Sequence, residues 1–236
     1  MQNFLEALDK AERVTFLTGA GVSTASGIPD FKSTDEAWPY EETREYLISL
    51  RYFHRNPERF WRIYREIFDV KFNAEENAVH RWIGELERTK EVHVITQNVD
   101  GLHQKGGSTS VIEAHGTNTK AVCMKCRHEV PMEATADKPT PRCPVCRKIL
   151  KPAVCLFDEQ VYGMQKIQQV LHTTDLLVVM GTSLDVGPVN YLPIYARDVE
   201  GAAVAWVNGT KPPDGYVFDH VVETELVKFV ESVPAS

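Results

Sequence analysis

Four cysteines in two CxxC pairs constrain this chain more than any other feature of its sequence. Cys123 and Cys126 form the first pair, Cys143 and Cys146 form the second, and sixteen residues separate the pairs. Each CxxC turn directs two thiolates to one side, and four thiolates complete the tetrahedron that zinc prefers. Two disulfides or four unrelated thiols are the alternative interpretation. Because four sulfur ligands leave no position for water, we expect the metal to stabilise a fold and the chemistry to lie elsewhere.

The size and composition of the chain are those of an ordinary globular protein. Its 236 residues fit one large domain, or a large domain with a small one inserted. The formal charge of −7 argues against nucleic-acid binding by the whole surface. Residues 120–151 carry eight basic against three acidic side chains, which favours a solvated zinc ribbon over a basic face for a partner.

The sequence predicts no membrane partner and a cytoplasmic location. The first residues have no charged leader followed by an apolar core, so no signal peptide is predicted. No apolar run approaches the roughly 20 residues that span a bilayer. A reducing compartment also suits metal-bound thiolates better than disulfides.

Short apolar runs that alternate with helical stretches predict the fold class. Residues 3–12 carry a helical stripe, and residues 41–86 are predicted to be largely helical, with Pro57 suiting a helix start. Five runs are predicted to be strands: 14–18, 91–98, 153–157, 175–183 and 202–208. Together they indicate an α/β fold with a Rossmann-like parallel sheet covered by helices on both faces. Ligands of such sheets bind beyond the carboxyl ends of the strands.

The first predicted strand runs into a glycine loop that favours a nucleotide. The loop, which begins at Gly19, lacks the third glycine of GxGxxG, and a tight structural turn explains it nearly as well. Its small residues let backbone N–H groups approach a pyrophosphate. Thr182 and Ser183 end a second strand and Asn208 ends a third. Three such strand ends at one crevice favour a dinucleotide.

The ordered set of motifs resembles one family, the sirtuins, which are NAD-dependent protein-lysine deacylases, and in particular its prokaryotic-type members. The motifs span most of the chain: GAGVSTASGIPDFK at 19–32, TQNVDGLH at 96–103, the pair at 115–116, the two CxxC pairs, KPAVCLFDE at 151–159 and GTSLDVGP at 181–188. The resemblance implies a Rossmann-like NAD-binding domain, and a small domain made of a helical module and the four-cysteine zinc ribbon. The expected boundaries are 1–31, 81–118 and 154–236 for the first domain, and 32–80 and 119–153 for the second.

The resemblance also implies a mechanism. In sirtuins the acyl oxygen of an acyl-lysine peptide attacks the nicotinamide ribose of NAD, and nicotinamide leaves. A histidine base then helps to deprotonate a ribose hydroxyl, and the products are free lysine and an O-acyl-ADP-ribose. His115 is the expected base by its place in the motif order, and the ordinary pKa of imidazole suits that role. Asn98 and Asp100 are expected to complete the catalytic set, and His103 is expected to be structural.

Further residues are implied by the same resemblance to contact NAD, the peptide and zinc. The expected NAD contacts are Gly19, Ala20, Gly21, Ser23, Thr24, Asp30, Phe31, Lys32, Gln97, Asn98, Val99, Asp100, His115, Gly181, Thr182, Ser183 and Asn208. The expected contacts of the acyl-lysine peptide or protein are Cys155, Phe157, Asp158 and Asp185. One structural zinc per chain is expected on Cys123, Cys126, Cys143 and Cys146.

The acyl preference is predicted from one helix. Family members that remove succinyl or malonyl groups carry Tyr-x-x-Arg there, and this chain has Tyr64 but Ile67 in the arginine position. An acidic acyl group would lose a charge-assisted pair. Arg65 is predicted to lie on another side of the helix. Acetyl and other uncharged acyl groups are therefore expected.

Three residues depart from the family pattern. Lys32 replaces an arginine and loses its planar fork, and Asp158 replaces a glycine and loses backbone freedom. Cys155 stands where valine is common, and we interpret it as a small apolar residue rather than a nucleophile. Asp158 and Asp185 are expected to flank the peptide, so we predict a preference for acyl-lysines with basic neighbours.

Two other functions remain open from the sequence. The same fold and co-substrate would also serve a protein ADP-ribosyltransferase, which product mass distinguishes. A non-catalytic module that binds NAD or docks through its zinc ribbon is the third possibility. Only Lys32 and Asp158 favour this third interpretation, while Asn98, Asp100 and His115 argue against it.

Overall fold

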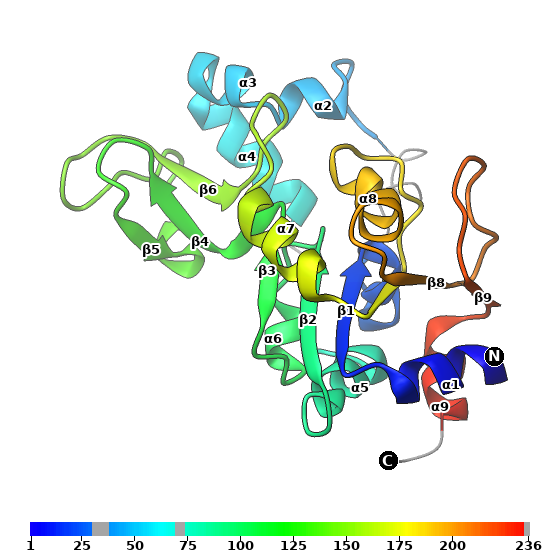
Figure 1. Ribbon diagram of the computed structural model, residues 1–236. Helices are drawn as coiled ribbons and strands as arrows, with labels where there is room; N and C mark the ends of the chain where they lie inside the picture. The colour runs from blue at the N-terminus through cyan, green and yellow to red at the C-terminus, as the bar shows by residue number, and fades with distance from the viewer. Residues whose placement is uncertain (30–37, 69–73, 234–236) are drawn as a thin grey trace.

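The computed structural model describes residues 1–29, 38–68 and 74–233. A six-stranded sheet in the order β3-β2-β1-β7-β8-β9 forms the centre of the molecule (Figure 1), and its neighbouring strands all run parallel. Its strands are β1 (Arg13–Thr18), β2 (Glu91–Thr96), β3 (Val111–Glu113), β7 (Leu176–Met180), β8 (Ala203–Asn208) and β9 (His220–Glu223). The predicted α/β fold is confirmed.

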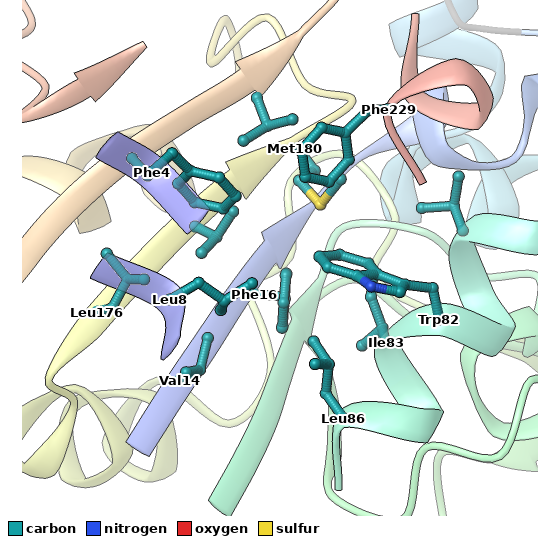
Figure 2. Close-up of a cluster of buried hydrophobic side chains, with 14 of the residues drawn as sticks. Phe4, Leu8, Val14, Phe16, Trp82, Ile83, Leu86, Leu176, Met180 and Phe229 are labelled. Carbon is teal, nitrogen blue, oxygen red and sulfur yellow. The ribbon is translucent and has the colours of Figure 1, made fainter. Parts of the chain in front are cut away.

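Helices cover both faces of this sheet, as the alternation of buried side chains requires. On one face Phe16 packs with Leu8 and Trp82, and Figure 2 shows this cluster. On the other face Leu17, the next residue of β1, packs with Leu171. The helices of the first face are α1 (Gln2–Lys10), α5 (Ala78–Leu86) and α9 (Leu226–Ser232), and those of the second are α7 (Met164–Thr173) and α8 (Leu192–Asp198).

A second, smaller sheet is antiparallel and carries the cysteines. Its order is β5-β4-β6, with β4 (Gly116–Cys123), β5 (Glu129–Pro131) and β6 (Leu150–Val154). Three helices pack against it, namely α2 (Arg44–Leu47), α3 (Leu50–Arg55) and α4 (Pro57–Phe68). Trp61 of α4 is fully buried and donates its indole N–H to the carbonyl of Leu150 at 3.0 Å. The helical module and the cysteine sheet thus share one core.

The remaining elements are short. Helix α6 covers Leu102–Lys105, and the 3-10 turns are η1 (Ala20–Val22), η2 (Thr24–Ser26), η5 (Met132–Thr135) and η6 (Val189–Tyr191). Among the described residues, no helix combines the length and the apolar character needed to cross a membrane.

One predicted strand belongs to a different sheet. The expectation that residues 153–157 lie in the parallel sheet is wrong, because β6 pairs antiparallel with β4 and ends at Val154. An apolar run of five residues shows that a strand is buried but does not determine its partner. The sequence analysis also missed the short strands β3, β5 and β9, and the eight-residue strand β4 of the cysteine sheet.

Candidate active site

The carboxyl ends of β1, β2 and β7 meet because the three strands are in register. Thr18 pairs with Thr96 on one side and with Met180 on the other, so the loops that follow leave the sheet at one edge. Gly21 N donates to Gly181 O at 2.7 Å. A Cβ on Gly181 would lie 2.4 Å from Val22 N, and its φ of +62° also favours glycine. The glycines therefore let two loops touch through their backbones.

Side-chain hydrogen bonds join the strand ends to one another. The amide of Gln97 donates to Thr182 Oγ1 at 2.9 Å, and Asn208 Nδ2 donates to Thr182 O at the same distance. Ser183 Oγ lies nearby on the exposed side and donates to Asp185 at 2.7 Å. Gln97, Thr182, Ser183 and Asn208, four of the predicted NAD contacts, thus lie along one edge of the sheet.

Asn98, Ser23 and Asp100 form a second polar network below the glycine loop. Asn98 Nδ2 donates to Gly19 O at 3.0 Å and to Ser23 Oγ at 3.1 Å. Ser23 Oγ in turn donates to Asp100 Oδ2 at 2.8 Å, and Asp100 Oδ1 accepts the N–H of Leu102 at 2.9 Å. Both carboxylate oxygens are therefore fixed in direction, although the residues come from different loops.

Sequence reasoning missed His80, which supports this network from behind. The backbone N–H of Asn77 donates to His80 Nδ1 at 3.2 Å, so the ring proton is on Nε2, which lies 3.4 Å from Ser23 Oγ. Burial lowers the pKa of His80 to about 4 and keeps the ring neutral at pH 7. The sequence does carry one signal for His80, the capping box that it forms with Asn77 at the start of α5. The sequence does not predict that His80 contacts Ser23, which lies 57 residues away along the chain.

His103 lies in the interior and outside the two polar networks of the site, and the expectation that it is structural stays a prediction. Its ring is buried and its Nε2 lies 2.9 Å from Thr18 Oγ1. Burial lowers the pKa of His103 to about 3, and the neighbouring His80 ring contributes to the shift.

His115 has a tautomer that suits a base. Its Nδ1 lies 3.0 Å from the backbone oxygen of Gln97, which can only accept, so Nδ1 carries the proton. The lone pair is therefore on Nε2. Burial lowers the pKa of His115, and the bond to Gln97 O raises it in part, which leaves the imidazole neutral near pH 7.

The backbone around His115 is tied to β6. The N–H of Cys155 donates to His115 O at 2.7 Å, and Gly116 pairs with Val154. Gly116 has a φ of +76°, and a Cβ there would lie 2.2 Å from Ala153 O. Only glycine fits this crossing of two strands, which explains the His-Gly pair.

A cavity of about 350 Å³ opens between the glycine loop and the loop after β6. The predicted site residues that line it are Ala20, Ser23, Gln97, Asn98, Val99, Asp100, His115, Cys155, Phe157 and Asp158. Gly19, Gly21, Thr24, Gly181, Thr182, Ser183, Asn208 and Asp185 lie outside its lining, and Asp30, Phe31 and Lys32 lie outside the described residues. Ten further residues that the sequence analysis did not assign to the site also line the cavity: Ile28, Arg44, Ile48, Phe68, Val154, Leu156, Glu159, Val161, Val186 and Gly187. Of these, Arg44, Ile48, Phe68 and Val161 lie outside every motif.

The loop after β6 is joined to the helical module by its backbone. Phe157 N donates to Ile48 O at 3.1 Å, and Leu50 N donates to Phe157 O at 3.0 Å. Asp158 follows with a φ of +75°, the left-handed region in which glycine is most at ease. The left-handed φ gives a conformational reason for the glycine that the resemblance leads us to expect at this position, and aspartate tolerates this φ.

The residues of α4 lie as the acyl prediction requires. Ile67 lines the cavity, whereas Arg65 donates to Thr135 O at 2.9 Å and to Lys138 O at 2.6 Å. Tyr64 is fully buried and its hydroxyl bonds to Asn118. The guanidinium of Arg65 is thus directed to the cysteine module, away from the cavity.

The four cysteines converge as a metal site requires. Their Sγ atoms all lie within 4.8 Å of one another, with Cys123–Cys146 at 3.4 Å and Cys126–Cys143 at 3.6 Å. A tetrahedron with Zn–S bonds of about 2.3 Å has edges of about 3.8 Å, so the donor set fits one zinc ion. The four are not paired in disulfides, and sulfur separations of 3.4 and 3.6 Å suit ligands of one ion rather than bonded sulfurs, which are about 2 Å apart.

The fold and the site define a class of protein: an α/β nucleotide-binding sheet joined to a four-cysteine ribbon, with a histidine at the cavity between them. The pattern that describes the Sir2 family matches residues 19–188. The NAD-dependent protein deacetylase of Bacillus cereus (strain ATCC 10987) is 41% identical over 99% of this chain and 98% of its own length. That of Bacillus subtilis (strain 168) is 35% identical, with the same coverage. The chain belongs to the Sir2 family.

Solved structures agree with this assignment. A Sir2 protein bound to an acetylated peptide superposes with a TM-score of 0.86, at 28% identity over 98% of this chain and 95% of the other. A Sir2 complex with a p53 peptide and NAD+ gives 0.85, at 30% identity and the same coverage.

Proposed function

We propose that this protein is an NAD-dependent protein-lysine deacetylase with His115 as its base. The observation that carries the proposal is the protonation of His115: Nδ1–H is committed to Gln97 O, and Nε2 is left as a lone pair beside a cavity lined by Asn98 and Asp100. The names of the relatives and the peptide and NAD+ complexes of the solved structures support the activity and the two substrates.

His115 acts by accepting a proton at Nε2 from a ribose hydroxyl. Since burial lowers its pKa, the neutral form persists below the ordinary imidazole value of about 6.5. The acid limb of kcat/KM should therefore lie below that pH, because protonation of Nε2 removes the base. The carbonyl of Gln97 holds the ring in the same orientation in both states.

The polar networks orient NAD. Asp100, fixed by Ser23 and the N–H of Leu102, accepts a hydrogen bond from the carboxamide of nicotinamide, and Asn98 lies between Asp100 and the glycine loop. Further contacts come from Gly19, Ala20, Gly21, Thr24, Gln97, Val99, Gly181, Thr182, Ser183 and Asn208, and from Asp30, Phe31 and Lys32 outside the described residues. Small residues along this edge allow close approach of a pyrophosphate.

The acyl-lysine lies in the cavity, with its peptide along Cys155, Phe157, Asp158 and Asp185. The apolar Ile67 favours acetyl and other uncharged acyl groups. The parallel sheet supports an NAD-binding domain of residues 1–31, 81–118 and 154–236, and the cysteine sheet with α2 to α4 supports a small domain of 32–80 and 119–153. Zinc on the four cysteines stabilises that small domain. We place the protein in the cytoplasm, where thiolates stay reduced.

Mass spectrometry of an acetyl-lysine peptide incubated with the protein and NAD tests the proposal. The expected result is loss of the acetyl mass with formation of O-acetyl-ADP-ribose, and its absence with His115→Ala. His172→Ala is the matched control, because the His172 side chain is 76% exposed on α7 and pairs with Glu200. Addition of ADP-ribose to a protein would instead identify a transferase, and an unchanged peptide with bound NAD would refute catalysis of deacetylation.

A further inference from the structure

A buried ion pair lies beneath the loop that follows β6. Lys151 Nζ and Glu159 Oε2 are 2.7 Å apart, and the two side chains are 3% and 14% exposed. Lys151 is on β6 and Glu159 comes directly after the loop, so the pair closes a ring of chain around residues 155–158.

The pair bonds to the backbone at the base of this loop. Lys151 Nζ donates to Val154 O at 2.6 Å, and Glu159 Oε2 accepts the N–H of Leu156 at 2.9 Å. The hydroxyl of Tyr162, 3.4 Å from Lys151 Nζ, supplies a third acceptor. Burial and the nearby Glu159 raise the pKa of Tyr162 to about 12, so the phenol stays neutral. The three N–H bonds of the ammonium therefore all have partners.

The same loop forms part of the site. Cys155, Leu156, Phe157, Asp158 and Glu159 line the cavity, and Cys155 N donates to His115 O. The backbone of Phe157 is paired with the helical module at Ser49. Without the ion pair, Val154 O would keep only the longer bond from the Tyr162 hydroxyl at 3.4 Å, and the Leu156 N–H would lose its side-chain acceptor. The Leu156 side chain would still be buried in the core.

We propose that Lys151 and Glu159 are positioning residues that hold the 155–158 loop in the shape that receives the acyl-lysine peptide. A buried ion pair adds little net stability compared with apolar residues of similar size, so stability alone does not explain its presence. Apolar residues would fill the space but could not hold Val154 O and the Leu156 N–H. The identity of the bound peptide rests on the proposed function, whereas the ordering of the loop does not.

The experiment compares single and paired substitutions. Lys151→Met alone leaves a buried, unpaired carboxylate and should lower Tm strongly. The double variant Lys151→Met/Glu159→Leu removes both charges and should regain much of that Tm. Its KM for the acetyl-lysine peptide should still be at least about tenfold raised, with the KM for NAD within about twofold. Hydrogen exchange of the amides of 155–159 should be at least about tenfold faster.

Asp175→Asn is the control for lost stability. Asp175 forms another well-aligned ion pair, with Arg13 at 2.7 Å, at the opposite end of the parallel sheet. This variant should lower Tm and leave the peptide KM and the protection of the loop unchanged. A double variant that keeps the wild-type peptide KM and the wild-type loop exchange would overturn the positioning role. If the wild-type protein does not turn over the peptide, the proposed function fails, and the exchange rates alone decide whether the pair orders the loop.

Discussion

The crossing of β4 and β6 beside His115, the proposed base, allows a quantitative test by adding a single methyl group. Gly116→Ala introduces a Cβ at a φ of +76°, 2.2 Å from Ala153 O and 2.9 Å from Val154 Cα. Both clashing groups are backbone, so β6 must move away from β4 by about 1 Å to reach an ordinary contact. That shift breaks the bond from Cys155 N to His115 O, which is 2.7 Å long.

The expected magnitude has two parts. A left-handed alanine costs about 1 kcal/mol, and the lost strand pairing with one unsatisfied buried N–H adds about 3 kcal/mol. The sum, about 4 kcal/mol, corresponds to a fall in Tm of roughly 8–16 °C for a chain of this size. A displacement of the base by about 1 Å should lower kcat about 100-fold.

Gly201→Ala is the matched control. Gly201 has the same φ of +76°, but a Cβ there meets nothing within 4 Å. Gly201→Ala therefore has only the cost of a left-handed alanine and no steric clash. Its Tm should fall by only about 2–4 °C and its kcat should not change. Thermal unfolding and peptide turnover of both variants provide the comparison. Equal destabilisation by the two alanines, or a Gly116→Ala enzyme with wild-type kcat, would refute the steric argument.

Three further predictions concern charge, metal and pH. Asp158→Asn removes the charge but keeps a residue that tolerates the left-handed φ. It should reduce the preference in kcat/KM for peptides with basic over acidic flanking residues by roughly 2–5-fold, measured with a pair of such peptides. Cys143→Ser or chelation should release the metal and unfold the zinc ribbon, which thermal unfolding should show as a separate early transition. Turnover of the peptide should be at least about tenfold lower. His80 and His103 have folded pKa values of about 4 and about 3 against about 6.5 when unfolded. The unfolded chain therefore binds more protons below pH 6.5, and the free energy of unfolding should fall as pH drops from 6.5 towards 4, less steeply in His103→Gln.

The strand ends were predictable because an apolar run is a local signal, and because parallel strands bring their carboxyl ends to one edge of the sheet. A run such as residues 14–18 is a strand on its own evidence, and the polar residues after such runs must collect at one edge of a parallel sheet. The cysteine spacing determined the metal site for the same reason, since each CxxC turn is local. Hence the glycine loop, Asn98, Thr182 and the four cysteines were predicted from the sequence pattern, whereas Asp100 was predicted only from the resemblance to the sirtuins.

The remaining lining of the site depends on contacts between distant segments. His80 reaches Ser23, Arg44 and Ile48 reach the cavity from the helical module, and no periodicity or spacing predicts these meetings. The error over residues 153–157 has the same origin, because an apolar run does not specify its partner strand. The reason for glycine at 116 also appears only when Ala153 lies against it.

Strand β6 explains how a closed metal site can affect chemistry that it does not touch. Its first residue, Leu150, pairs with the zinc ligand Cys123, and its last, Val154, pairs with Gly116 beside the base. The next residue, Cys155, bonds to His115 O, and Lys151 within the strand bonds to Val154 O and to Glu159 at the base of the 155–158 loop. Loss of the metal would therefore free one end of the strand that positions both the base and the peptide. Because the NAD edge belongs to the parallel sheet, removal of zinc should raise the KM for peptide more than the KM for NAD.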